Sequence, residues 1–419
     1  MPYLKGMAYL SLTACFIEPV TMRHLNILLV IGLLAASVIF FSRCFHAGAS
    51  PDPRGKAYAG AEACVSCHRD IATSYAHNNH YKTSSDIQYD SLRKIAAADR
   101  KRVYFMDSNY VAVEEKDHAF YQTLHGADSS VSQPFDIAFG SAEKAQTYGY
   151  WKGKSLYELP LTWLTGTHSW INSPGFTASH AHFGRIIPSR CFECHASYIY
   201  KETVPSGSLS VSEELDRGTI IYGIDCERCH GPAAKHVQFH NDHPAEKTAR
   251  FITAIHSLSR QRQLDLCGMC HSGNDLTTQR TLFAFKPGDT LSHFFYPDFG
   301  LTAGNEPDVH GKQLQLLESS RCFKESNLTC TTCHNTHAPE RNTMTAFIAV
   351  CMSCHQNSAH AAEMMTITEQ VKKDSSAGGR NCIDCHMPLQ TSKTIYFNNG
   401  AGMKNIPYQI RTHRIAVYQ

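Results

Sequence analysis

One short pattern, Cys-x-x-Cys-His, occurs seven times in this chain. The copies are Cys64–His68, Cys191–His195, Cys226–His230, Cys267–His271, Cys330–His334, Cys351–His355 and Cys382–His386. The two thiols of a copy are three positions apart, so they lie on one side of a helical turn and reach both vinyl groups at one edge of a porphyrin. The adjacent histidine can then donate a ring nitrogen to the iron.

The repeat therefore predicts seven covalently attached c-type haems, numbered below as motifs 1 to 7 in chain order. The thioether cysteines would be Cys64, Cys67, Cys191, Cys194, Cys226, Cys229, Cys267, Cys270, Cys330, Cys333, Cys351, Cys354, Cys382 and Cys385. The proximal iron ligands would be His68, His195, His230, His271, His334, His355 and His386.

Two other interpretations of paired cysteines fit less well. Zinc sites also use cysteines two apart, but they do not require histidine at the next position of every pair. Disulfides between such close neighbours constrain little of the chain and leave the regular histidine without a role. Haem attachment explains all three residues of the pattern.

Composition indicates an exported protein without a charge-selected partner. The motifs use fourteen of the 17 cysteines, a density typical of compartments outside the cytosol. Lys and Arg total 39 against 37 for Asp and Glu, so no basic field favours nucleic acid. Cys322 is one of three cysteines outside the motifs, and a buried thiol is its simplest interpretation.

The first 49 residues have the features of an export signal. Basic residues at Arg23 and His24 precede an apolar run over 25–41, and Ala47-Gly48-Ala49 resembles a cleavage site. We favour a cleaved signal, with an uncleaved membrane anchor as the alternative, because the run is at the lower limit of what spans a bilayer. Residues 1–21 look like an over-extended start, and 50–57 look like a linker.

The remaining 58–419 are predicted to form one multihaem cytochrome domain, mostly α-helical and irregular, organised around stacked haems. Short connections between later motifs leave room for little besides helices, expected at 213–217, within 245–266, at 314–320, 342–352 and 361–373. A β-rich subdomain is expected at about 100–165, because strand-like runs alternate there with turn residues. Those runs are 103–105, 110–113, 119–121, 135–139, 147–151 and 156–159.

Histidines outside the motifs are the expected distal ligands, and they favour bis-histidine, low-potential haems over methionine ligation. A histidine within a few residues of its own motif cannot reach the far side of that haem, but it can reach a neighbouring haem. His236, His337 and His360 meet this condition, and His80 and His413 are further candidates. His180, His182 and His310 are weaker ones.

The order of several short motifs resembles the cytochrome c-552/c-554-type multihaem family, which is related to the hydroxylamine oxidoreductase and pentahaem nitrite reductase group. The matching segments, spread over about 57–415, include Tyr58-Ala59-Gly60 with motif 1 and His80, then Gly223–Val237, Leu328–His337 and Thr412–Ile415. This resemblance implies periplasmic electron transfer, stacked haem pairs and distal ligands at His80, His236, His337 and His413.

Two functions remain in competition. The first is an electron-transfer protein that carries electrons from a membrane-linked, quinol-dependent donor to a periplasmic acceptor. The second is a multihaem oxidoreductase that acts on a small nitrogen or sulfur compound at an open iron. Related nitrite reductases mark such an iron with Cys-x-x-Cys-Lys, and all seven motifs here end in histidine. We therefore favour electron transfer over catalysis.

Overall fold

The computed structural model describes residues 27, 30–33, 52–97, 101–273, 275–296, 307–340, 344–357, 381–398 and 405–418. The chain divides into two units, Met1–Asp52 and Pro53–Gln419. Nearly all of the predicted export signal lies outside the described residues, as does the helix expected at 361–373. Within the described parts, no helix combines the length and apolarity needed to cross a membrane.

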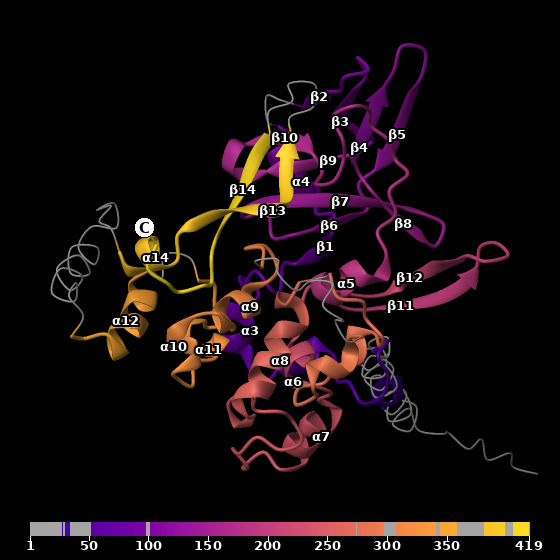
Figure 1. Ribbon diagram of the computed structural model, residues 1–419. Helices are drawn as coiled ribbons and strands as arrows, with labels where there is room; N and C mark the ends of the chain where they lie inside the picture. The colour runs from indigo at the N-terminus through magenta and orange to yellow at the C-terminus, as the bar shows by residue number, and fades with distance from the viewer. Residues whose placement is uncertain are drawn as a thin grey trace, which may run out of the picture. The chain divides into compact units, whose positions relative to one another are not determined.

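Two antiparallel sheets form the β-rich region of the second unit (Figure 1). One has the strand order β2-β3-β4-β5, with β2 (Arg102–Tyr104), β3 (Tyr110–Lys116), β4 (Ala119–His125) and β5 (Ser130–Pro134). The other has the order β1-β6-β7-β9-β10, with β8 paired to β7. Its strands are β1 (Ser84–Asp86), β6 (Ile137–Phe139), β7 (Ala145–Lys152), β8 (Ser155–Glu158), β9 (Leu161–Leu164) and β10 (Ser169–Asn172).

This region has an apolar core made of its own side chains. Trp163 and Trp170 pair across β9 and β10, and every residue of these two strands is buried. Tyr148 and Phe135 pack against Trp170, and helix α4 (Tyr89–Ala96) adds Leu92. The strand runs predicted from sequence coincide with β2, β3, β4, β6, β7 and β8, and the strands continue beyond residue 165 to Asn172.

A long hairpin joins motif 2 to motif 3. Helix α5 (Ser189–His195) runs directly into β11 (Ala196–Pro205), which pairs with β12 (Val211–Tyr222). The helix predicted at 213–217 is therefore wrong. Residues 213–216 pair with Tyr200–Thr203 of β11, and this tertiary pairing overrides the helical preference of Glu213-Glu214-Leu215.

The motif-bearing helices are short and lie together, apart from the core of the β-rich region (Figure 1). They are α2 (Ala61–Val65), α5, α6 (Cys226–His230), α8 (Arg260–His271), α11 (Cys330–Cys333), α12 (Met344–Cys354) and α14 (Cys382–His386), and we include with them α3 (Arg69–Tyr75) and α7 (Ala234–Asp242), which follow motifs 1 and 3. Helices α9 (Gln313–Glu318) and α10 (Arg321–Lys324) lie between α8 and α11 in sequence, and short 3-10 turns occur at η1 (Thr165–Thr167), η2 (Ile255–Ser257), η3 (Leu282–Ala284) and η4 (Leu291–Phe294). The helices predicted within 245–266, at 314–320 and at 342–352 correspond to α8, α9 and α12, shifted by a few residues.

A C-terminal hairpin connects the two regions. Strands β13 (Leu389–Asn398) and β14 (Asn405–Arg411) pair with each other, and Phe397 packs on Leu164 and Ile171 of the β-rich region. The residues after β14 return to the motif-bearing helices, where Ser320 binds the backbone of His413 and Ile415. Strands thus take up about as much of the chain as helices, and the prediction of a mostly α-helical protein is only partly right. Sequence reasoning missed both hairpins: motifs 2 and 3 flank the first, and motif 7 directly precedes the second.

Candidate haem-binding site

Each motif is built on a helical turn, as the spacing of its thiols predicts. Motifs 3 and 7 coincide with α6 and α14, and motifs 2, 4 and 6 end α5, α8 and α12. Polar residues start the turns: Asp225 accepts from the backbone of Arg228, and Asn381 accepts from two backbone N–H groups of α14. All fifteen described cysteines are free thiols, and the described residues contain no group of three or more His, Cys, Asp or Glu placed to hold a metal ion.

The motif helices form one connected set. Thiols of different motifs contact each other in three places: Cys64 with Cys226, Cys194 with Cys270, and Cys267 with Cys330. These hydrogen bonds raise the pKa of one thiol in each pair and lower the pKa of the other. The pKa of Cys194, which is hydrogen-bonded to Cys270, falls to about 7. Helix contacts continue from α11 to α12 and from α12 to α14. The Cys229 thiol of motif 3 also acts on Cys267 and Cys270 of motif 4. Motifs 1 and 3, 3 and 4, 2 and 4, 4 and 5, 5 and 6, and 6 and 7 are therefore neighbours.

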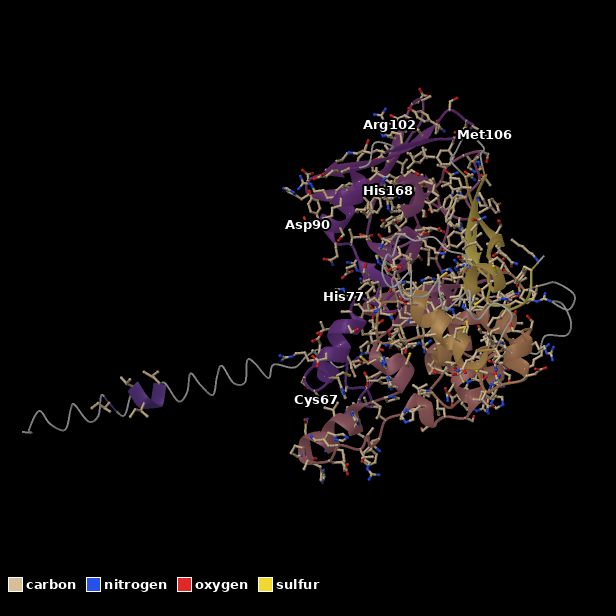
Figure 2. All side chains as sticks on the ribbon, turned by 90° about the vertical axis from the view of Figure 1, so that its left-hand side faces the viewer. Cys67, His77, Asp90, Arg102, Met106 and His168 are labelled. Carbon is tan, nitrogen blue, oxygen red and sulfur yellow. The ribbon has the colours of Figure 1, made fainter. Side chains whose placement is uncertain are left out.

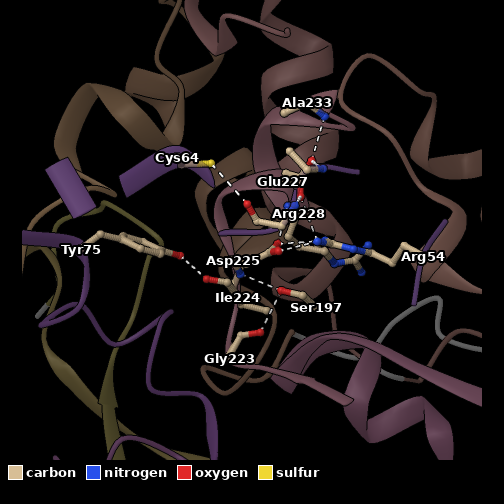
Figure 3. A network of polar contacts seen from close by, with 12 residues as sticks. Arg54, Cys64, Tyr75, Ser197, Gly223, Ile224, Asp225, Glu227, Arg228 and Ala233 are labelled. Carbon is tan, nitrogen blue, oxygen red and sulfur yellow. Dashed lines mark hydrogen bonds and ion pairs between the residues drawn. The ribbon is translucent and has the colours of Figure 1, made fainter. Parts of the chain in front are cut away.

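An ion-pair network holds motif 1 against motif 3 (Figure 3). Arg54 binds Asp225 at 2.7 Å and Glu227 at 3.1 Å, and all three side chains are almost completely buried. Glu227 also accepts the backbone N–H groups of Ala59 and Gly60, next to motif 1. The backbone before motif 3 passes so close to Tyr81 that a Cβ at Gly223 would lie 2.0 Å from the Tyr81 carbonyl oxygen, so only glycine fits there. This close passage brings the segment carrying His80 beside motif 3, where Ile224 donates to the His80 carbonyl at 2.9 Å.

Five of the seven proximal histidines have their Nδ1 atoms engaged by oxygen atoms of the protein. The partners are the carbonyls of Thr83 (3.4 Å from His195), Thr253 (3.0 Å from His230) and Ala416 (2.9 Å from His386), Gln313 Oε1 (3.3 Å from His271) and Glu340 Oε2 (2.7 Å from His334). Because these oxygens only accept hydrogen bonds, Nδ1 must donate, which leaves the Nε2 lone pair available to a metal.

Four pairs of histidine rings, each joining a motif to a residue elsewhere in the chain, have the spacing that one iron requires. An imidazole nitrogen lies about 2 Å from a metal, so two imidazoles on opposite sides have ring centres about 6 Å apart. The observed separations are 6.4 Å for His68 and His236, 6.0 Å for His271 and His80, 5.8 Å for His230 and His337, and 6.2 Å for His334 and His413.

Electrostatics favour the ligand form of these rings. Burial lowers the pKa of His80 to about 4, with further lowering from His271, while the carboxylate of Glu340 acts in the opposite direction. Burial and the neighbouring His334 lower the pKa of His413 to about 4 as well. Both rings are therefore neutral at pH 7, and neutral imidazole is the form that binds metal.

Other buried donors suit the carboxylates that a haem carries. Arg228 donates to the carbonyls of Leu282 and Glu193, but its Nε is buried without a hydrogen-bond partner. Arg190 Nη2, next to motif 2, is buried and unpartnered in the same way. The thiol pairs, the oriented imidazoles and these buried cations together fit a covalently attached haem at the motifs.

The remaining predicted ligands fall into three groups. His360 lies outside the described residues. His182 stacks on Phe176 and has the tilted ring of His180 at 5.8 Å, and neither histidine ring lies beside a described motif histidine. His310 has its ring beside Tyr408, although it lies near enough to His195 to lower the pKa of that residue, for which burial is the larger cause.

Motif 2 differs from the four paired motifs. The ring beside His195 is that of Phe139, edge-on at 5.9 Å, and no described histidine ring lies opposite His195 at the spacing of the pairs. Among the described residues, no histidine ring lies opposite His355 or His386 at this spacing either.

Sequence reasoning missed the partners of the Nδ1 atoms. Three are backbone carbonyls, which carry no side-chain signal, and Gln313 lies 42 residues from His271. Glu340, six residues after His334, was the one partner with a local signal, because a carboxylate closely following a proximal histidine can fold back onto its ring.

These features define a multihaem c-type cytochrome. The cytochrome c3 family model matches residues 322–398, which contain motifs 5 to 7. Among solved structures, the outer cell wall cytochrome OcwA has a similar fold, with a TM-score of 0.51 and 17% sequence identity over 86% of this chain and 80% of that chain. At that identity the likeness concerns the fold alone. No curated protein matches the chain.

Proposed function

We propose that this protein is an exported electron-transfer cytochrome whose seven covalently attached haems form one array. The observation that carries the proposal is the set of four histidine pairs at 5.8–6.4 Å, each of which joins a motif to a histidine from another segment. When bound, a c-type haem supplies an iron that changes between the ferrous and ferric states. An imidazole on each side leaves that iron no position for substrate.

In this proposal each distal histidine also links two parts of the chain. His236 and His80 serve motifs 1 and 4, and His337 and His413 serve motifs 3 and 5. The contacts between motif helices support a path 1-3-4-5-6-7, in which the Cys229 thiol of motif 3 acts on Cys267 and Cys270 of motif 4. Motif 2 joins this path as a branch at motif 4, through Cys194 and Cys270.

The surroundings of the array are also part of the proposal. The cysteine content and the N-terminal apolar run support export to the periplasm, with possible retention at the membrane by an uncleaved anchor. A quinol-linked donor and a periplasmic acceptor protein are the proposed partners. Distant kinship with the hydroxylamine oxidoreductase and nitrite reductase group belongs to the same proposal.

The test uses the mature protein. Its intact mass should exceed the polypeptide by seven haems, and low-temperature electron paramagnetic resonance should resolve low-spin signals from at least four haems. His337→Ala should convert one low-spin haem to a high-spin form that binds carbon monoxide when reduced, because it removes the ring opposite His230. His243→Ala is the matched control, since its ring packs on Phe239 outside the four pairs. A wild-type spectrum dominated by high-spin haem would contradict the proposal.

A second candidate function, reduction or oxidation of a small nitrogen or sulfur compound, is favoured by motif 2. The ring beside His195 is that of Phe139, and no described histidine ring lies at the spacing found in the four pairs. If the wild-type protein turns over nitrite or hydroxylamine, and Cys191→Ser with Cys194→Ser abolishes that turnover, catalysis replaces electron transfer as the main function. Carbon monoxide binding at one haem without turnover would leave the electron-transfer proposal standing.

A further inference from the structure

One proximal histidine differs from the others in the charge of its hydrogen-bond partner. Among the five whose Nδ1 contacts are described, His195, His230, His271 and His386 donate to neutral oxygens at 2.9–3.4 Å. His334 of motif 5 donates to a carboxylate, Glu340 Oε2, at 2.7 Å. The contact is the shortest of the five and the only one of them with an anion.

We propose that Glu340 is a positioning residue that lowers the reduction potential of the haem at motif 5, making it the haem hardest to reduce among those with described Nδ1 partners. The inference rests on the proposed function, since it requires His334 to be an axial ligand. It goes further by assigning a different potential to one site of the array and naming the residue responsible.

The physical reason is the negative charge. A carboxylate that accepts from Nδ1 draws the proton toward itself and raises the basicity of the opposite ring nitrogen, which then donates more strongly to the metal. A ferric centre carries one more positive charge than a ferrous one, so stronger donation and a nearby negative charge both stabilise the oxidised state. A carbonyl oxygen, as at His230 and His386, exerts this effect only through its dipole.

The loop that carries Glu340 is built to hold the carboxylate in place. Glu340 Oε1 accepts the backbone N–H of Asn335 at 2.6 Å, so both oxygens are engaged by the segment that follows motif 5. Asn335 Oδ1 in turn accepts the N–H of His337 at 3.1 Å. The loop is also tied to another part of the chain, because Asn78 donates to the Ala338 carbonyl at 2.7 Å.

This placement extends the influence of Glu340 to motif 4. Asn78 lies two residues before His80, the ring opposite His271, and the charge of Glu340 acts on His80. The same carboxylate thus lies near axial histidines of two neighbouring motifs, with direct contact only at motif 5. We expect the larger effect there.

The chain supplies a reciprocal pair of variants for the test. Glu340→Gln removes the charge and keeps an oxygen that can accept from His334. Gln313→Glu places a carboxylate at the Nδ1 of His271, where the structure has an amide oxygen at 3.3 Å. Glu325→Gln is the charge-matched control, because Glu325 is exposed and pairs with Arg321 away from any histidine.

Spectropotentiometric titration of the mature proteins gives the decisive readout. At the wild-type midpoint of the motif 5 haem, the ratio of oxidised to reduced haem should fall about tenfold in Glu340→Gln, equivalent to about 59 mV for one electron. Gln313→Glu should shift one haem in the opposite direction, and Glu325→Gln should shift none. The electron paramagnetic resonance g-values of one haem should change in Glu340→Gln without any gain of high-spin signal. Glu340→Asp, which keeps the charge, should restore the wild-type potential in part.

Unchanged midpoints in Glu340→Gln and Gln313→Glu would overturn the inference, as would an equal shift in Glu325→Gln. If Glu340→Gln does not fold, the direction of the Gln313→Glu shift decides alone. A wild-type protein without low-spin haems would instead refute the proposed function.

Discussion

The β-rich region and the motif-bearing helices bury apolar surface in different ways. Strands β9 and β10 are buried at every position, around a core that includes Trp163 and Trp170. Helices α2, α3, α7 and α11 have no buried residue at all, although α8 packs in a smaller apolar cluster with Met269 and Phe294. In Figure 2, Cys67 lies among the motif-bearing helices, and Arg102 and Met106 lie in the β-rich region.

This difference indicates that the two regions depend on different sources of stability. Side-chain burial alone can hold the β-rich region together. Helices this short, several of them without a buried residue, have little stability of their own, so we infer that the motif-bearing region needs its covalently attached cofactors as a core. The comparison predicts that changes at the motifs affect mainly the yield of haem-loaded protein, and that changes in the sheets affect mainly the free energy of unfolding.

The largest effect is expected from removing the attachment thiols of motif 3 with Cys226→Ser and Cys229→Ser. Motif 3 contacts motifs 1 and 4, and its Arg228 is buried against the carbonyl of Glu193 in motif 2. We expect the yield of mature protein to fall at least tenfold, with proteolysis starting in the motif-bearing helices. Mass spectrometry of the fragments locates the cuts. Cys322→Ser, outside the motifs, is the control, and a normal yield with one haem missing would contradict the comparison.

Trp163→Ala tests the other side of the comparison. Trp163 is 4% exposed and packs on Trp170, so truncation should cost about 3–5 kcal/mol of unfolding free energy. The number of haems per folded chain and their electron paramagnetic resonance spectrum should not change. Urea titration followed by fluorescence and by haem absorbance separates the two effects. Tyr104→Ala, at an exposed ring of β2, should have almost no effect, and haem loss in Trp163→Ala would mean that the regions fold as one.

Arg54→Met tests what joins motif 1 to motif 3. The change leaves Asp225 and Glu227 buried without their cation, which should cost about 3 kcal/mol, at the low end for a broken buried pair. The cost is moderated because both carboxylates keep backbone N–H donors. Unfolding monitored by haem absorbance measures it. Lys154→Met removes an exposed pair with Glu214 and should leave the unfolding free energy almost unchanged. Equal losses in the two variants would show that burial gives the Arg54 network no special role.

The parts of the fold that follow from local pattern could be predicted, and the parts set by distant pairing could not. Helical turns at the motifs follow from the spacing of their thiols, and β3 and β7 follow from runs of strand-forming residues. Residues 213–217 form a strand because β11 lies beside them, which nothing in their own sequence specifies. For the same reason, sequence identified His80 and His413 as possible ligands, but only the fold brings each of them opposite one motif histidine.

The smallest predicted effect concerns the C-terminal hairpin that links the two regions, and it depends on pH. Asp308 is 6% exposed, and its carboxylate accepts from the side chains of Ser392 and Thr394 and from the backbone of Lys393. Burial acts to raise the pKa of Asp308, but these hydrogen bonds outweigh it and hold the pKa at about 2, below the ordinary value of 3.8.

The pKa of Asp308 is lower in the folded state than in the unfolded chain, which means that the fold stabilises the charged form of this carboxylate. The contribution of Asp308, about 2 kcal/mol, is therefore complete above about pH 4 and disappears as the pH falls toward 2. Asp308→Asn should destabilise the protein by this amount at pH 7 and by almost nothing at pH 2, when measured by urea unfolding across the range. Asp242→Asn, at an exposed position of α7, should match wild type at every pH. A constant difference between Asp308→Asn and wild type would show that the hydrogen bonds stabilise the hairpin without any preference for the charged form.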